Sequence, residues 1–333
     1  MMSALAAEIP LHFLIRAPFA DELERLRDGG VDAHWEKFTE GPEAWALQTY
    51  LHAFRAGWNV TAGTALLRGA INLAHVATLS AFHSRPGDLI VGIRADYRPS
   101  GLADCHIVQN QLQIGPRSYW IPHWSQPALI PRSTSRRGLT RTAYFGREYY
   151  LQGGHDRWSD SLRQLGIAFD CPPAHHWNDY SQVDLMVAIR SFDDYPYPRK
   201  PPTKLLNAWI AGVPALVGLE SAYHQIGLAG RDYLVAHTFE EALDHVERLQ
   251  ADQSLYASIV EAGYQRAQQF TREKTLSAWN ELITTQLVPL WNQIRRPSVT
   301  RRIHWLCRNT VGGVRSLGVR AARRLFGSRP LSR

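Results

Sequence analysis

Cysteine is scarce in this sequence, and long apolar runs are absent. The 333 residues include three cysteines, Cys105, Cys171 and Cys307, with no CxxC pair among them. This odd, sparse set disfavours a disulfide framework and a zinc site, and it indicates a reducing compartment. No stretch approaches the ~20 apolar residues of a membrane-spanning helix, and the N-terminus lacks the basic and apolar regions of a signal peptide. We therefore expect a cytoplasmic protein without a bound metal.

Lysine, aspartate and glutamate are missing from residues 295–333, which hold eleven arginines. The rest of the chain then carries fewer basic than acidic residues, so the basic excess lies entirely in this tail. Apolar residues recur there at steps of three and four, at Val311, Val314, Leu317, Ala321 and Leu325. This pattern predicts a basic amphipathic helix on an anionic membrane surface, with Trp305 and Phe326 as interface residues. Nucleic-acid binding is the less favoured alternative, and a solubilising tail without structure is the third.

The length of the chain favours two domains. In the first part we expect strands at 11–17, 59–66, 87–96, 103–110 and 118–124, and a helix at 44–57 that stops at Gly57. Prolines and small polar residues then mark a linker. We therefore divide the chain into an N-terminal α/β domain at 1–125, a linker at 126–140, a second α/β domain at 141–294 and the basic tail at 295–333.

The second domain alternates between strand and helix patterns. Strands are expected at 141–146, 167–171, 183–190, 213–219 and 232–236, and helices at 157–166, 201–212, 239–249, 253–270 and 271–294. Short apolar runs between amphipathic helices are typical of a parallel sheet with helices on both faces.

Basic residues gather around the helix expected at 201–212. Arg190 ends the preceding strand, and Lys200 and Lys204 flank the start of the helix. Helix N-termini attract phosphate, and ligands of such sheets bind beyond the carboxyl ends of the strands. Asn207 lies one turn beyond Lys204, where its amide suits sugar or ribose hydroxyls, and Glu220 ends the next strand. These residues predict a site for a diphosphate.

The segment KPPTKLLNAWIAGVP at residues 200–214 resembles the C-terminal half of GT-B glycosyltransferases, including the turn Ala211–Pro214 after the helix. The resemblance implies two Rossmann-like domains that face a cleft, a nucleotide-sugar donor, no further cofactor and no metal for the chemistry. It also implies that Lys200, Lys204, Asn207 and Glu220 contact the donor. Common retaining members have two glutamates eight positions apart on this helix. Asn207 stands near the first position, so the sequence leaves open whether the reaction inverts or retains the anomeric configuration.

The same rule of strand ends places polar residues of the first domain on the opposite wall of the cleft. The residues expected to line it are Arg94, Asp96, Asn110, His123 and Trp124, with Gly146 at the end of the first strand of the second domain. An inverting transferase needs a general base, for which Asp96 and His123 are the candidates. A retaining enzyme would instead rely on the lysines and arginine to stabilise the departing diphosphate.

We therefore expect a glycosyltransferase that uses a nucleotide-sugar and acts on a glycan or lipid-linked acceptor, in the cytoplasm and peripherally at the inner face of the membrane. A sugar-nucleotide epimerase of the same fold is one alternative. A non-catalytic protein that binds a membrane or nucleic acid through its tail is another.

Overall fold

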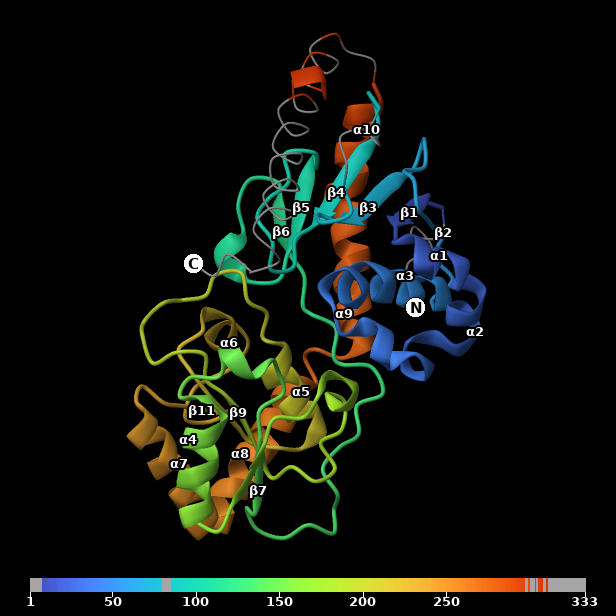
Figure 1. Ribbon diagram of the computed structural model, residues 1–333. Helices are drawn as coiled ribbons and strands as arrows, with labels where there is room; N and C mark the ends of the chain where they lie inside the picture. The colour runs from blue at the N-terminus through green and yellow to red at the C-terminus, as the bar shows by residue number, and fades with distance from the viewer. Residues whose placement is uncertain are drawn as a thin grey trace.

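The computed structural model describes residues 8–79 and 85–296, together with residues 299, 303, 305–307 and 310. Within them the chain forms two parallel sheets, each in its own layered domain (Figure 1). The first has the strand order β2-β1-β3-β4-β5-β6 and the second β11-β10-β9-β7-β8. This confirms the expected α/β architecture of two Rossmann-like domains. The amphipathic pattern from Val311 to Leu325 lies outside the described residues.

The N-terminal sheet contains one strand that the sequence analysis missed. Its strands are β1 Leu11–Leu14, β2 Val60–Gly63, β3 Ile71–His75, β4 Leu89–Ile93, β5 Cys105–Val108 and β6 Ser118–Trp120. The missed strand, β3, lies between β1 and β4 and is buried throughout. Asn72 and His75 interrupt its apolar pattern. The amide of Asn72 is nevertheless satisfied, because it accepts from Leu67 N at 2.8 Å and donates to Leu67 O at 3.0 Å. A buried polar side chain with partners on both sides is tolerated in a core.

Helices α1 Ala17–Asp21, α2 Leu23–Ala33 and α3 Gln48–Arg55 accompany this sheet, and a π turn at Glu43–Leu47 leads into α3. The helix predicted at 44–57 is therefore confirmed in outline. Gly57 follows its end with φ +76°, a left-handed conformation that glycine adopts at little cost.

The C-terminal domain follows the predicted alternation closely. Its strands are β7 Arg141–Ala143, β8 Ala168–Asp170, β9 Leu185–Ala188, β10 Ala215–Val217 and β11 Leu234–Val235. Its helices are α4 Gly154–Gln164, α5 Thr203–Ala211, α6 Ser221–Ile226, α7 Phe239–Ala251 and α8 Gln253–Ala267. Helices α5 and α8 pack closely because Gly263 faces the indole of Trp209. A Cβ at position 263 would lie 2.4 Å from Trp209 Cδ1, which no real contact allows.

The last helices return to the N-terminal domain. Helix α9 Arg272–Leu282 continues through a π turn at Ile283–Leu287 into α10 Val288–Arg295, and both run alongside the first sheet (Figure 1). Trp279 and Trp291 belong to the same buried cluster as Trp45 and Tyr50. The sequence analysis had assigned 271–294 to the C-terminal domain. That assignment is wrong for these helices, because an amphipathic pattern shows that one face is buried but not which sheet covers it.

The chain crosses between the domains twice, once in the linker and once between α8 and α9. Both crossings are attached to Asp32, near the end of α2. Its carboxylate accepts from Ala128 N at 2.6 Å and from the two terminal nitrogens of Arg272 at 2.7 and 2.6 Å. Beyond Ala128 the linker runs along the C-terminal domain, where Ile130 N donates to Asn178 O at 2.8 Å.

Within the described residues, no helix combines the length and the apolar character needed to cross a membrane.

Candidate functional site

The two domains meet through polar side chains at the carboxyl ends of their strands. After β5, Gln109 Nε2 donates to Arg199 O at 3.0 Å, and Asn110 Nδ2 donates to Lys200 O at 3.2 Å and to Ser221 Oγ at 2.9 Å. Both side chains are buried. Asn110, expected to line a cleft, therefore lies at the junction of the domains, beside the loop that carries the predicted phosphate-binding lysines.

Arg190 is the centre of this region. It follows β9, and its side chain is 12% exposed. The rings of Tyr150 and Tyr197 bracket its guanidinium carbon at 4.9 and 5.5 Å from their centroids. Its Nε lies 3.4 Å from Glu220 Oε1, close enough for an ion pair but not aligned for a hydrogen bond. Nε and Nη1 are both buried without a hydrogen-bond partner in the described part of the chain. Buried donors without partners are costly, so this arrangement is typical of a site that a ligand completes.

Lys204 lies in the first turn of α5, next to Arg190. Its Nζ is 5.3 Å from the ring centroid of Tyr144, a buried residue just beyond β7. Burial, with a smaller contribution from the charge of Arg190, lowers the pKa of Lys204 to about 8, whereas Glu220 acts in the opposite direction. Gly146 follows Tyr144, and a Cβ there would lie 2.9 Å from the Tyr144 ring. Gly146 was predicted to line the cleft. Because it has no Cβ, it leaves room for the Tyr144 ring that faces Lys204.

Lys200 connects the two domains. Its Nζ forms an ion pair with Oδ2 of Asp96, which follows β4, and lies 5.5 Å from the centroid of the Tyr150 ring. Asp96 Oδ1 also accepts from Gln109 Nε2 at 2.9 Å. The structure therefore brings Asp96 together with the predicted donor-binding residues. We call Arg190, Lys200, Lys204, Glu220 and Asp96 the interdomain site.

Asn207 does not join this site as predicted. It is 6% exposed, and its Oδ1 accepts from the backbone N of Gln126 at 3.0 Å. Its side chain fixes the start of the linker instead of offering an amide to a sugar. Residues three apart share a helix face, but this spacing does not show what packs on that face. At Asn207 the linker packs on α5.

His123 is placed poorly for a general base. Its Nδ1 donates to Trp124 O, and its ring packs edge-on against Trp45 with centroids 4.7 Å apart. Burial lowers the pKa of His123 to about 4, so the ring is a weak proton acceptor near neutral pH. Of the two predicted bases, Asp96 is the one whose carboxylate reaches the interdomain site.

Trp124 was expected to line the cleft and is instead part of the N-terminal core. It is 1% exposed, its Nε1 donates to Thr49 Oγ1 at 2.8 Å, and its ring lies 4.2 Å from that of His52. That prediction is wrong, because a strand end positions the backbone but not the direction of the side chain.

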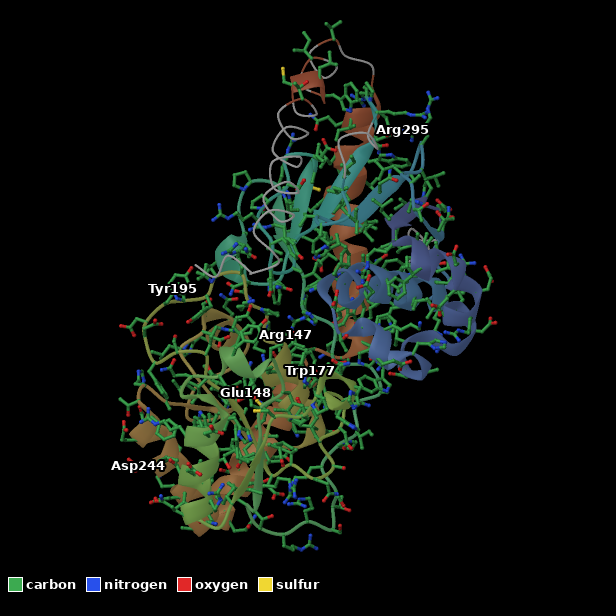
Figure 2. All side chains as sticks on the ribbon, in the orientation of Figure 1. Arg147, Glu148, Trp177, Tyr195, Asp244 and Arg295 are labelled. Atoms are coloured by element: carbon green, nitrogen blue, oxygen red, sulfur yellow. The ribbon has the colours of Figure 1, made fainter. Side chains whose placement is uncertain are left out.

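Arg94, Tyr150 and Tyr197 lie around the interdomain site. Arg94 is 7% exposed and donates from Nε to Tyr97 O at 3.2 Å. The sequence analysis missed Tyr150 and Tyr197. Tyr197 has φ +45°, a strained conformation for an aromatic residue and one that clusters at functional sites. Arg147, labelled in Figure 2, follows β7, and its charge interacts with that of Glu40 in the other domain.

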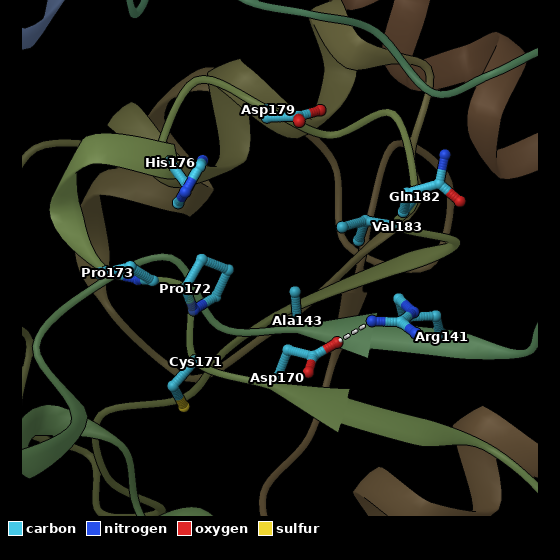
Figure 3. A pocket seen from close by; sticks show the side chains of 10 residues that line it. All are labelled: Arg141, Ala143, Asp170, Cys171, Pro172, Pro173, His176, Asp179, Gln182 and Val183. Carbon is cyan, nitrogen blue, oxygen red and sulfur yellow. Dashed lines mark hydrogen bonds and ion pairs between the residues drawn. The ribbon is translucent and has the colours of Figure 1, made fainter.

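A separate cavity of about 310 Å³ lies in the C-terminal domain, beside the edge strand β8 (Figure 3). Asp170 and Arg141 form an ion pair in it at 2.7 Å, and Cys171, His176 and Asp179 contribute to its lining. None of the residues predicted to bind a donor lines it. Across the described ranges, no three His, Cys, Asp or Glu side chains cluster in a way that could hold a metal ion.

The arrangement of two parallel-sheet domains is that of the GT-B fold, which confirms the resemblance seen in the sequence. Residues 132–279, less than half of the chain, match the family described as glycosyl transferase-like. The protein therefore has the GT-B fold, and the sequence of its C-terminal domain is glycosyl transferase-like.

Solved structures give the same fold at low sequence identity. HepE from Anabaena, in complex with UDP and glucose, is 14% identical, covers 84% of this chain and 100% of its own, and superposes with a TM-score of 0.51. Sucrose-phosphate synthase from Thermosynechococcus elongatus is 12% identical, covers 85% of this chain and 100% of its own, and superposes with a TM-score of 0.52. The chain spans only 52% of TarM from S. aureus, at 11% identity, 61% coverage of this chain and a TM-score of 0.45. No curated protein sequence matches the chain significantly.

Proposed function

We propose that the protein is a metal-independent glycosyltransferase that moves a sugar from a nucleoside diphosphate sugar to an acceptor hydroxyl. The observation that carries the proposal is Arg190, a bracketed and buried guanidinium with two unfilled donors beside Lys204. Guanidinium and ammonium groups at the carboxyl edge of a parallel sheet match the charge and the acceptor oxygens of a diphosphate. The glycosyl transferase-like match over residues 132–279 supports this assignment.

In the proposed reaction the bond between the anomeric carbon and the β-phosphate oxygen breaks, and negative charge accumulates on the departing diphosphate. Arg190 and Lys204 are preorganised to stabilise that charge in a site shielded from water. Lys200 would exchange its partner, leaving Asp96 for a phosphate oxygen. In an inverting reaction the freed Asp96 carboxylate accepts the proton of the acceptor hydroxyl, whereas a retaining reaction requires no such base.

The proposed cellular setting rests on the sequence alone. A cytoplasmic location follows from the scarcity of cysteine. Peripheral attachment to the inner face of the membrane, which would favour a lipid-linked acceptor, follows from the eleven arginines of residues 295–333.

Nucleotide titration of the full chain tests the donor site. We expect UDP, the nucleotide held by HepE and hence the first probe, or another nucleoside diphosphate to bind in calorimetry. Lys204→Ala should weaken that binding at least about tenfold, because it removes a charge-assisted contact. Lys274→Ala, an exposed lysine on α9, is the matched control and should leave the affinity unchanged. Failure of every nucleoside diphosphate to bind would contradict the proposal.

Incubation with a nucleotide-sugar alone separates the transferase from the epimerase. A transferase should leave the donor sugar unchanged until an acceptor is present. An altered donor sugar in the absence of any acceptor would favour the epimerase instead.

The affinity for the diphosphate should also depend on pH. Lys204 has a pKa of about 8, below the ordinary lysine value, so its ammonium is present below pH 8 and is lost as the pH rises through that value. Titrations between about pH 7 and 9 should show weakening above pH 8 that approaches tenfold per pH unit. Lys204→Arg keeps its charge throughout this range and should abolish the dependence. A wild-type affinity that stays constant up to pH 9 would show that the Lys204 ammonium does not contact the diphosphate.

A further inference from the structure

A second pair of basic residues, Arg94 and Arg199, lies on the N-terminal side of the interdomain site, apart from Arg190 and Lys204. We call this pair the basic corner. Arg94 follows β4 directly, and Arg199 precedes Lys200 in the opposing loop. Gln109 lies between the two, because it is the first residue after the end of β5, the neighbour of β4, and its Nε2 donates to Arg199 O at 3.0 Å. The two side chains come from different domains and interact electrostatically with one another.

Arg94 is held in place but left without a counter-charge. The turn after β4 closes on itself, because Tyr97 N donates to Arg94 O at 2.9 Å and Arg94 Nε donates to Tyr97 O at 3.2 Å. Ala95 within this turn has φ +46°, a strained conformation for a residue with a side chain. Arg94 is 7% exposed, yet neither it nor Arg199 forms an ion pair with any acidic residue in the ranges that the structure describes. A buried guanidinium is normally paired, since removing its charge from water is expensive.

Two further observations mark the corner as incomplete. Burial lowers the pKa of Arg94, and the nearby charge of Arg199 lowers it further, so the two cations repel one another across the junction. Gln109, which is 2% exposed, has a buried Oε1 atom that no donor of the described residues reaches. A ligand that brings an anionic group to the two arginines and a hydroxyl to Gln109 would satisfy both deficits at once.

We propose that Arg94 and Arg199 form an anion subsite on the acceptor side of the interdomain site, and that the acceptor of this enzyme bears a phosphate or carboxylate close to its hydroxyls. The inference rests on the proposed function, because it assigns the donor to Arg190 and Lys204 and the acceptor to the N-terminal wall. Neutral sugars would lack the group that offsets the two guanidiniums. Arginine presents paired N–H donors that suit both phosphate and carboxylate.

The test is a calorimetric titration of the full chain, saturated with UDP so that the donor site is occupied. The probes are glucose 6-phosphate, glucuronate and methyl glucoside, which separate phosphate, carboxylate and neutral ligands. We expect one or both charged sugars to bind at least about tenfold more tightly than methyl glucoside. The stronger of the two charged sugars identifies the anionic group. Equal binding of all three probes would overturn the proposal.

Substitutions locate the site. Arg94→Gln and Arg199→Gln should each weaken binding of the charged sugar about tenfold or more, without changing the affinity for UDP more than about twofold. Arg98→Gln, an exposed arginine four residues after Arg94, is the matched control and should have no effect. If Arg94→Gln fails to fold, the Arg199→Gln variant tests the subsite, because Arg199 is partly exposed. An unchanged affinity for the charged sugar in Arg199→Gln would overturn the subsite.

The subsite and the proposed function can fail separately. If UDP does not bind but the charged sugars bind in a manner that depends on Arg94, the donor assignment falls and the anion subsite stands. If UDP binds and the charged sugars do not, the donor site stands and the subsite falls.

Discussion

Replacement of Arg190 by alanine is expected to lower kcat/KM for sugar transfer by about 10²–10³-fold. This guanidinium lies nearest to where we place the departing diphosphate, and the rings of Tyr150 and Tyr197 both lie against it. The side chain is 12% exposed, and two of its donors have no partner in the part of the chain that the structure describes, so they are free to bind the diphosphate. The loss should therefore appear mainly in kcat, as the charge on the diphosphate grows in the transition state.

Initial rates with saturating donor and acceptor, together with UDP affinity from calorimetry, measure this effect. Arg190→Lys should recover only a small part of the activity, because an ammonium has neither the planar surface that stacks on the rings nor the paired, fixed donors of a guanidinium. Arg163→Ala, which removes an exposed arginine of α4, should behave as the wild type. A full kcat in Arg190→Ala would show that the leaving group is stabilised elsewhere.

Replacement of Asp184 by alanine is expected to destabilise the C-terminal domain by about 3–5 kcal/mol. This carboxylate, one residue before β9, is fully buried and ion-paired with Arg132 at 2.9 Å and Arg136 at 2.6 Å. It also accepts from the backbone N of Thr140 at 3.0 Å and of Arg141 at 2.9 Å. Its removal would leave the two linker guanidiniums and two backbone donors without their acceptor. Urea unfolding of the full chain measures the change.

The pH dependence of stability supplies a check on the same residue. Burial alone would raise the pKa of Asp184, but the bonds from Arg136 and Thr140 and the charge of Arg132 outweigh it and lower the pKa to about 2. Its stabilising contribution is therefore complete above about pH 4 and is lost as the pH falls towards 2. Asp184→Ala should lack this component. Asp170→Ala, which breaks a half-exposed ion pair with Arg141, should cost no more than about 1 kcal/mol. An equal cost for both variants would contradict the role given to Asp184.

The sequence was informative where local pattern and tertiary structure agree. Buried parallel strands are short continuous apolar runs, so β7, β9 and β10 could be located to within a few residues, and with them Arg190, Lys200 and Lys204. Strand β3 could not, because Asn72 and His75 break its pattern and find their partners only in the folded state.

The direction of individual side chains was the main source of error. Trp124 and Asn207 both lie close to strand or helix ends, yet one enters the core and the other holds the linker. Asp96, predicted by the same rule, does reach the interdomain site. Sequence position alone does not distinguish these outcomes. The bracket around Arg190 joins the connection between β9 and α5, which holds Arg190 and Tyr197, to the connection between β7 and α4, which holds Tyr150, and that meeting has no signature in sequence spacing.

The attachment of both chain crossings to Asp32 determines how the domains can separate. Since Ala128 and Arg272 are fastened to one carboxylate, the domains cannot translate apart without breaking it, but they can rotate about an axis that passes through it. Helix α6 lies on the opposite side of the molecule from α2 in Figure 1. The polar contacts between Asn110 and Ser221 therefore lie far from this axis, where a small rotation produces a large displacement. Under the proposed function, such a rotation would admit the donor to Arg190 from that far side, while the neighbourhood of Asp32 would stay almost still.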